Sequence, residues 1–294
     1  MTVPAQQPDE RRWILTVACT DRVGIVAAIT GALAAVGGFV LDSQQYADLD
    51  SGRFFLRIAF MGTSQAFPAS ETGLHALVAP IAERFDMEWT LDDAARRPRV
   101  LIAVSNTSHC LNDLLHRWST GSLPIEPVGV VSNHETLRPL TQWHKLPYHH
   151  LPIDKADKAA QEAALLALFD ETGAELLVLA RYMQILSAQT VAALAGRCIN
   201  IHHSFLPSFK GAKPYHQAHA RGVKLIGATA HFVTGDLDEG PIIEQAAERV
   251  DHRATPDDLI ATGRDIEAQV LARAVGWIAE RRVLLNGQRT IVFR

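Results

Sequence analysis

The chain has 294 residues, of which 48% are hydrophobic and 20% are charged. This length is enough for two domains of ordinary size, and the composition is that of a globular protein with a sizeable buried core. The formal net charge of −4 gives no reason to expect a nucleic-acid partner or a membrane surface.

The cysteines and the apolar stretches indicate the cellular compartment of the protein. Three cysteines (Cys19, Cys110 and Cys198) lie far apart, which favours a reducing compartment over a disulfide framework. The first ten residues are polar and lack the apolar core of a signal peptide. The longest apolar stretches are too short to cross a bilayer. We therefore expect a cytoplasmic protein with no membrane partner.

The first predicted domain covers residues 11–91 and has the element order β-α-β-β-α-β. The turn Asp50-Ser51-Gly52 between two strands is a hairpin signal. This order is that of the ferredoxin-like α+β fold. The predicted elements are strand Trp13–Cys19, a helix that begins at an Asp21 cap, strands Phe39–Leu49 and Arg53–Met61, helix Leu74–Phe85 and strand Met87–Leu91.

The charged, alanine-rich residues 92–98 are predicted to be a linker, and residues 99–294 a second domain. Strands alternate with helices there, which predicts a Rossmann-like α/β domain with a mostly parallel, doubly wound sheet. The predicted elements are strand Val100–Val104, helix Cys110–Trp118, strands Ile125–Val131 and Leu146–Leu151, a helix from an Asp154 cap to about Thr172, strand Leu176–Ala180, helix Ala188–Ala195, strand Cys198–His202, helix Pro214–Arg221, an antiparallel pair Leu225–Val233 and Ile242–Val250, and helix Pro256–Arg282.

Two clusters of polar residues in the second domain suggest chemistry. Asn200 and His202 lie two residues apart at the end of a strand, so their side chains share one face. Ligands of open parallel sheets bind at the carboxyl ends of the strands. The segment His231–Pro241 is a loop rich in carboxylates that can bring Asp238 next to His202.

Other readings of these clusters are open on the pattern alone. A His-His pair often packs in a partly buried position, and Asp-rich loops between strands are usually solvated turns. A metal site is disfavoured because no Cys-x-x-Cys or His-Glu-x-x-His spacing exists. Cys198 lies inside an apolar strand and fits the core better than a nucleophile. The clusters by themselves support only a hydrolase or a transferase.

The two motifs resemble the signature of the folate-dependent formyltransferase family. An Asn-x-His motif leads into a Ser-Phe-Leu-Pro turn at residues 200–207, and His-Phe-Val-x-x-x-Leu-Asp-x-Gly-Pro-Ile follows at residues 231–242. The similarity spans about residues 98–285. It implies that Asn200, His202 and Asp238 are catalytic, that folate is the substrate, and that no metal or other cofactor is required.

The resemblance also implies a set of substrate-binding residues. The stretch Arg181-Tyr182-Met183-Gln184-Ile185-Leu186 is similar to the loop over which the folate pterin binds in this family. The residues expected to bind substrate are Arg181, Met183, Ile185, Leu186, His203, Gly211, His231 and Gly240.

Within the family the chain is most similar to the formyltetrahydrofolate deformylases. His203 stands where the transferases have proline, and Gly211–Ala218 is similar to the deformylase version of the following loop. The loop Ser105–Cys110 lacks the glycines that cradle a substrate phosphate in the ribonucleotide transformylase. These features favour water as the acceptor. His203 either narrows the acceptor side of the site or supports the structure behind it.

The first domain resembles an ACT domain, a regulatory module, through Thr20–Val26 between its strand and helix. Asp21 and Gly24 are therefore candidates to bind an amino-acid effector such as glycine or methionine. An equally good account makes Asp21 a helix cap and Gly24 a close-packing glycine. A module that serves only to form a homo-oligomer is also compatible with the pattern.

The resemblance implies hydrolysis of 10-formyltetrahydrofolate to formate and tetrahydrofolate. Asn200 and His202 would stabilise the oxyanion, and Asp238 would activate water, directly or with His202. Two rivals are a formyltransferase that uses an amine acceptor, and a non-catalytic regulator that binds an amino acid and folate.

Overall fold

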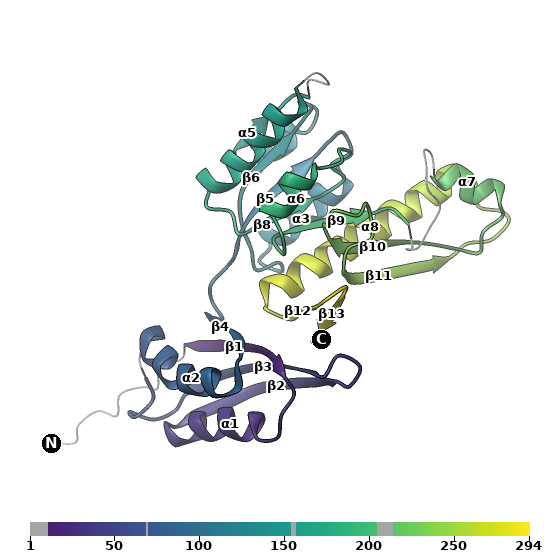
Figure 1. Cartoon of the computed structure of the whole chain (residues 1–294). Helices are drawn as coiled ribbons and strands as arrows, with labels where there is room; N and C mark the ends of the chain where they lie inside the picture. The colour runs from purple at the N-terminus through teal and green to yellow at the C-terminus, as the bar shows by residue number, and fades with distance from the viewer. Residues whose placement is uncertain (1–10, 69, 154–156, 205–213) are drawn as a thin grey trace. The chain divides into compact units, whose positions relative to one another are not determined.

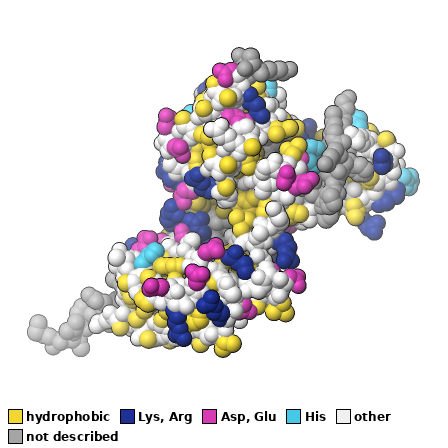
Figure 2. All heavy atoms as spheres, viewed as in Figure 1, with side chains coloured by type: hydrophobic (Ala, Val, Ile, Leu, Met, Phe, Trp, Pro, Cys, Tyr) yellow, Lys and Arg dark blue, Asp and Glu magenta, His cyan; other side chains and the backbone are white. Residues whose placement is uncertain are grey.

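The computed structural model describes residues 11–68, 70–153, 157–204 and 214–294, which form two compact units. Unit 1 contains the described residues up to Arg96 together with Glu280–Leu284 and Ile291–Arg294. Unit 2 contains the described residues from Arg97 to Ala279 and Leu285–Thr290. Figure 1 shows the elements of both units. On the face drawn in Figure 2, acidic and basic side chains are interspersed in each unit.

Unit 1 is an antiparallel sheet of strand order β2-β3-β1-β4 with two helices on one face. Residues that alternate along β1, from Trp13 to Cys19, pack with both helices in one hydrophobic core. The order β-α-β-β-α-β is that of a ferredoxin-like unit. Its elements are β1 (Arg12–Thr20), α1 (Ile25–Ala35), β2 (Gly38–Asp48), β3 (Arg53–Gly62), α2 (Glu71–Phe85) and β4 (Glu88–Asp93).

The predicted cap of the first helix is wrong. Helix α1 begins at Ile25, and its N-cap is Gly24, whose φ of 98° lies in the left-handed region that favours glycine. Asp21 is exposed and donates its backbone N–H to Gly52 O at 2.9 Å, in the hairpin turn between β2 and β3. The backbone geometry alone therefore accounts for a glycine at position 24.

The end of the chain belongs to unit 1, which differs from the predicted second domain of residues 99–294. Ala18 and Phe55, on the sheet face opposite the helices, pack with Phe293 near the carboxyl end of the chain. The strands β12 (Val283–Asn286) and β13 (Arg289–Val292) pair with each other after helix α8. No strand was predicted beyond Arg282. The expected linker is also shorter, because β4 continues to Asp93.

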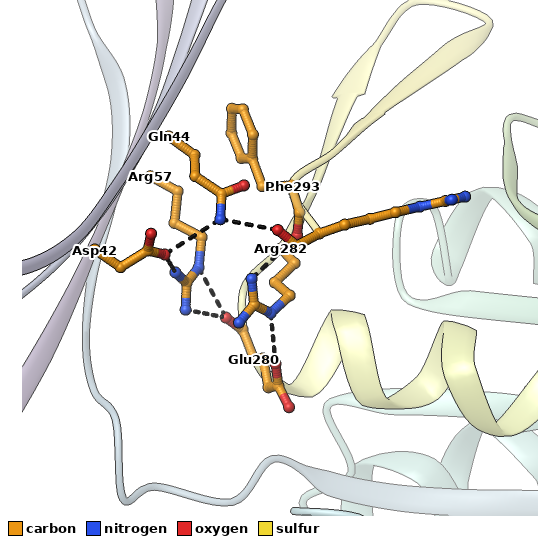
Figure 3. Close-up of polar contacts among 7 residues, drawn as sticks. Asp42, Gln44, Arg57, Glu280, Arg282 and Phe293 are labelled. Atoms are coloured by element: carbon orange, nitrogen blue, oxygen red, sulfur yellow. Dashed lines mark hydrogen bonds and ion pairs between the residues drawn. The ribbon is translucent and has the colours of Figure 1, made fainter.

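A buried arginine holds this end of the chain on unit 1 (Figure 3). Arg57 of β3 is 4% exposed, and its Nη1 lies 2.9 Å from Asp42 Oδ2. Its Nε and Nη2 donate to the backbone oxygen of Glu280 at 3.2 and 3.1 Å. Gln44 Nε2 donates to Arg294 O at 3.0 Å. Charge-assisted bonds of this kind are the stronger hydrogen bonds in proteins, so Arg57 is the principal anchor of this segment.

We expect Arg57→Met to lower the free energy of unfolding of unit 1 by about 1–3 kcal/mol, because the Glu280 carbonyl loses both its charged donors. Arg53→Met on the same strand is the control. Its partner Glu88 is 79% exposed, and such a surface pair contributes less than about 1 kcal/mol. Hydrogen exchange of β1–β3 amides in the full chain measures the difference. Equal losses in the two variants would contradict the anchoring role.

In the described part of the chain, unit 2 contains a seven-stranded sheet of order β11-β10-β9-β8-β5-β6-β7. The strands from β9 to β7 are parallel, β10 is antiparallel to β9, and β11 is antiparallel to β10. The strands are β5 (Arg99–Val104), β6 (Glu126–Ser132), β7 (Tyr148–His150), β8 (Leu176–Leu179), β9 (Cys198–His202), β10 (Leu225–Phe232) and β11 (Ile242–Arg249). This confirms the predicted mostly parallel α/β domain.

Helices cover both faces of this sheet. Leu165 and Phe169 of α5 pack against Leu101 and Leu177 on one face. Helix α8 contacts α3 and crosses β9, β10 and β11 on the other (Figure 1). Among the described helices, none is long and apolar enough to cross a membrane. The helices are α3 (His109–Ser119), α4 (Arg138–Trp143), α5 (Lys158–Glu171), α6 (Ala188–Ala193), α7 (Pro214–Ala220) and α8 (Pro256–Ala279).

Two details of these helices differ from the predictions. Helix α4 was not predicted, since six residues are too few to show a helical period. The N-cap of α5 is Asp157, whose side chain accepts the backbone N–H of Ala160, and the predicted cap Asp154 lies outside the described residues.

Gly263 in α8 gives a sharp test of packing in unit 2. A Cβ there would lie 2.1 Å from the Tyr215 hydroxyl oxygen, whereas a Cβ at Gly276 in the same helix would lie 3.5 Å from Leu123. We expect Gly263→Ala to lower the free energy of unfolding by about 1–3 kcal/mol through overpacking. Gly276→Ala should raise it by about 0.5–1 kcal/mol, because alanine favours helix. Urea denaturation compares them, and a stabilised Gly263→Ala variant would contradict this packing.

Candidate active site

The site begins at the paired strands β9 and β10. Cys198, Asn200 and His202 alternate along β9 and share one face of the sheet. Cys198 is 1% exposed and packs in the core, and burial raises the pKa of its thiol, so it is not a nucleophile. Asn200 and His202 extend beyond that core. The register pairs Asn200 with His231 of β10, which places their side chains next to each other.

The loop after β10 closes tightly on the end of the strand. A Cβ at Gly240 would lie 1.8 Å from the backbone oxygen of Phe232, so only glycine fits there without a backbone shift. Phe232 N donates to Pro241 O at 2.9 Å. Asp238, two residues before Gly240, has a φ of 58°, a left-handed conformation that costs a non-glycine residue about 1 kcal/mol or more. The closed loop keeps Asp238 in this unfavourable conformation.

Asp238 then lies between two histidines. Its Oδ2 is 3.2 Å from His202 Nδ1, and its Oδ1 is 3.7 Å from His231 Nε2. His202 contributes most, and His231 next, to lowering the pKa of the Asp238 carboxyl well below its ordinary value. Partial burial opposes this but does not outweigh it. The carboxylate therefore stays charged at neutral pH and accepts the His202 Nδ1–H.

The remaining contacts of His202 and Asn200 orient their reactive atoms. Because His202 Nδ1 faces the carboxylate, the other ring nitrogen, Nε2, faces Ser204 Oγ at 2.9 Å. Asn200 Nδ2 lies 3.4 Å from His231 Nε2. His231 in turn donates from Nδ1 to Phe232 O at 2.8 Å, which fixes its ring. A hydrogen-bond donor, a proton carrier and a charged carboxylate thus meet in one place.

These residues line a cavity of about 430 Å³, which is within the range of small-molecule sites. Its rim carries large apolar side chains that are more than half exposed, those of Met183, Ile185 and Leu237. Flat apolar surfaces beside a few fixed polar groups suit an aromatic ligand with a polar reacting centre.

The loop from Arg181 to Ser187 forms one wall of this cavity and is fixed at both ends. Met183 N donates to Ser105 Oγ at 3.0 Å. At the other end, Ser187 N donates to Glu162 Oε1 at 3.0 Å. Burial raises the pKa of Glu162, but hydrogen bonds from Ser187 and Thr190 outweigh this and lower it, so a charged carboxylate lies at the start of α6. Hydrogen bonds to Ser105 and Glu162 therefore anchor the loop on either side of its exposed residues.

The structure brings most of the expected site residues together. Gly240 is absent from the described cavity lining. Its close approach to the Phe232 backbone explains why a glycine stands at this position. Gly211 lies outside the described residues. The cavity is also lined by residues that were not predicted to bind substrate, namely Leu179, Tyr182, Gln184, Val191, Ile201 and residues 233–237. The expected residues that line it are Asn200, His202, Asp238, Arg181, Met183, Ile185, Leu186, His203 and His231.

Among the described residues, one group of potential metal ligands lies close together, formed by His109, Cys110 and Glu267. Both Glu267 oxygens already accept hydrogen bonds, from Tyr215 and His109. Burial raises the pKa of Cys110 well above its ordinary value, so its sulfur is a thiol and not the thiolate that binds metals. This donor set fits a buried hydrogen-bond network better than a metal.

The chain resembles known proteins over nearly its whole length. A formyl transferase family model matches residues 98–275. A formyltetrahydrofolate deformylase of Corynebacterium sp. strain P-1 is 51% identical over 97% of this chain and 99% of its own, and one of Bacillus subtilis is 48% identical over 97% and 95%. The solved structure of a formyltetrahydrofolate deformylase from Burkholderia mallei has a TM-score of 0.92 and 55% identity, over 97% of this chain and 100% of that one. The chain belongs to the formyltetrahydrofolate deformylase family.

Proposed function

We propose that the chain hydrolyses 10-formyltetrahydrofolate to formate and tetrahydrofolate, with Asn200, His202 and Asp238 as its catalytic residues. The observation that carries this proposal is the contact of His202 Nδ1 with Asp238 Oδ2 at 3.2 Å, beside Asn200 in an apolar-rimmed cavity. The names of its relatives indicate the substrate, and the geometry supports the roles.

The cavity suits a folate. Met183, Ile185 and Leu237 offer apolar surface to the flat pteridine and benzoyl rings. The anchored loop from Arg181 to Ser187 offers backbone groups to the polar edge of the pteridine. The formamide on N10 then points toward the polar side of the cavity, where Asn200 and His202 lie.

Hydrolysis proceeds by addition of water and then elimination. His202 Nε2 takes a proton from water as the oxygen attacks the formyl carbon, and the carbonyl oxygen becomes an oxyanion. Asn200 donates its amide N–H to that oxyanion. His202 then returns the proton to N10, the bond from the formyl carbon to N10 breaks, and formate leaves with the oxygen of water.

Asp238 acts through His202 in this scheme. A carboxylate whose pKa lies well below its ordinary value is a poor proton acceptor at neutral pH, so Asp238 is better suited to support a neighbouring base than to be one. It orients the His202 ring through Nδ1 and stabilises the imidazolium that forms when Nε2 takes the proton. Of the two routes expected for water activation, the route through His202 is the better supported.

Water is favoured as the acceptor over an amine. His203 fills the position beside His202, with ring centroids 4.8 Å apart, and narrows the side from which an acceptor would approach. The first loop of unit 2 also lacks the glycines that would cradle a nucleotide phosphate. A formyltransferase with an amine acceptor is the alternative, and it predicts little formate without that amine.

We further propose that unit 1 is an ACT-like regulatory domain. Its edge strand β2 carries Phe39 and Tyr46, which are 56% and 45% exposed, and such an edge suits pairing with a second copy in a homo-oligomer. Asp21 and Gly24, at the exposed start of α1, are the candidates to contact an amino-acid effector such as glycine or methionine. Three buried cysteines, all free, support a cytoplasmic location.

The test is formate release from 10-formyltetrahydrofolate with no amine present. We expect multiple turnovers for the natural chain, and losses in kcat of about 10²–10³ for Asn200→Ala and about 10⁴ for Asp238→Asn. Glu239→Gln is the matched control, because Glu239 is an exposed carboxylate next to Asp238 that is not in the described cavity lining.

Circular dichroism must show that each variant is folded. Near-normal turnover of Asp238→Asn would remove the role given to this carboxylate. Formate release that starts only when an amine is added would favour the transferase.

A further inference from the structure

Arg181 connects the cavity to a buried cluster behind it. This residue follows β8, has a left-handed φ of 65° and a side chain that is 15% exposed. Its Nη1 lies 2.8 Å from His203 Nδ1, and its Nε lies 3.3 Å from Glu267 Oε2. The unusual backbone conformation and the two contacts fix the guanidinium between the histidine and the carboxylate.

Glu267 is a fixed anion at the far side of Arg181. It belongs to α8 and its side chain is 1% exposed. Tyr215 donates to its Oε1 at 2.8 Å, and His109 Nε2 lies 2.7 Å from its Oε2. Burial raises the pKa of Glu267, but the hydrogen bond from His109 and the charge of Arg181 outweigh it and leave the pKa below its ordinary value. Glu267 is thus a charged, saturated partner that holds Arg181 in place.

The contact with Arg181 determines where His203 carries its proton. A guanidinium has only N–H donors and stays charged in proteins, so His203 Nδ1 must accept the bond. The ring is therefore neutral, and its single proton is on Nε2. The neutral state also suits the stacking on His202, whose ring lies 4.8 Å away at an angle of 26°. Two imidazolium rings stacked so closely would repel each other.

We propose that Arg181, held by Glu267, is a positioning residue that keeps His203 as a neutral imidazole with its proton on Nε2. Of the two stacked rings, only His202 then becomes positively charged during the reaction. The role of this arrangement in catalysis rests on the proposed hydrolysis. The protonation state of His203 stands on the contacts themselves.

Among the described residues, the charged and titratable groups that face His203 fit this assignment. Burial, Arg181 and His202 lower the pKa of His203 to about 4, against smaller opposite effects of Glu267 and Asp238. Tyr215 of α7 lies with its ring centroid 6.4 Å away, and burial raises its pKa, so it stays neutral. His203 is then uncharged at neutral pH.

The first measurement is nitrogen NMR of the histidine rings in the unaltered full chain. We expect the ring of His203 to show a proton on Nε2 and none on Nδ1, and to stay neutral from pH 6 to pH 8, because its Nδ1 accepts from Arg181 and burial with that guanidinium lowers its pKa to about 4. Assignment comes from loss of the signals in His203→Gln. A His203 that titrates near the ordinary histidine pKa of about 6.5, or one protonated on Nδ1, would overturn the proposal. This result does not depend on turnover, so it is separate from failure of the proposed function.

The second measurement is the pH profile of formate release. The pair Arg181→Met with Glu267→Gln removes both charges together, so neither is left buried alone. In this pair His203 can take a proton, and we expect a new fall in kcat of up to about eightfold between pH 7 and pH 5.5, near the ordinary histidine pKa. Adding His203→Gln should abolish that fall, because the glutamine amide keeps a donor near the Nε2 position and cannot be protonated.

Rescue of the pH profile by His203→Gln separates an electrostatic role of Arg181 and Glu267 from a merely structural one. Loss of packing alone would lower kcat at all pH values, and His203→Gln would not restore the acid side of the profile. A pair variant with the natural pH profile, or one that the third substitution fails to rescue, contradicts the proposal. Should the pair not fold, the NMR measurement on the unaltered chain decides.

Discussion

The contact between His202 and Asp238 depends on the pairing of β9 with β10 and on the loop that follows β10. His202 ends a parallel strand, and Asp238 follows an antiparallel one, so the contact joins two segments paired by β9 and β10. Asp238 contacts His202 from a left-handed backbone conformation, in a loop that Gly240 closes against the Phe232 carbonyl. The antiparallel pairing of β9 with β10, a glycine without room for a side chain and an aspartate with left-handed backbone therefore together build this contact.

Two carboxylates and one arginine surround the stacked histidines of the site. Asp238 supports His202 on one side, while Glu267 holds Arg181 against His203 on the other. Both carboxylates have pKa values below their ordinary range, since each accepts hydrogen bonds from its neighbours. The stacked histidines thus differ in their partners, and only the ring beside a carboxylate is suited to become charged.

The sequence predicted the parts of this protein that depend on local pattern. Alternating strands and helices identified both units, and the spacing of Asn200 and His202 placed them on one face. Contacts between distant residues were not predictable in this way: Arg57 meets a carbonyl 223 residues away, and Glu267 faces a histidine from another helix. The misplaced cap at Asp21 has a physical reason too, since a left-handed glycine begins α1 instead. The family resemblance, rather than spacing, supplied the role of Asp238.

The central claim is that His202 and Asp238 deliver water to the formyl carbon. Hydrolysis in water enriched in oxygen-18, without any amine, tests it most directly by mass spectrometry of the formate. If His202 and Asp238 deliver water to the formyl carbon, each formate released carries one labelled oxygen, and Asp238→Asn loses that product at an unchanged fold. Formate without label, or a formyl group that leaves the folate only when an amine is supplied, would contradict it.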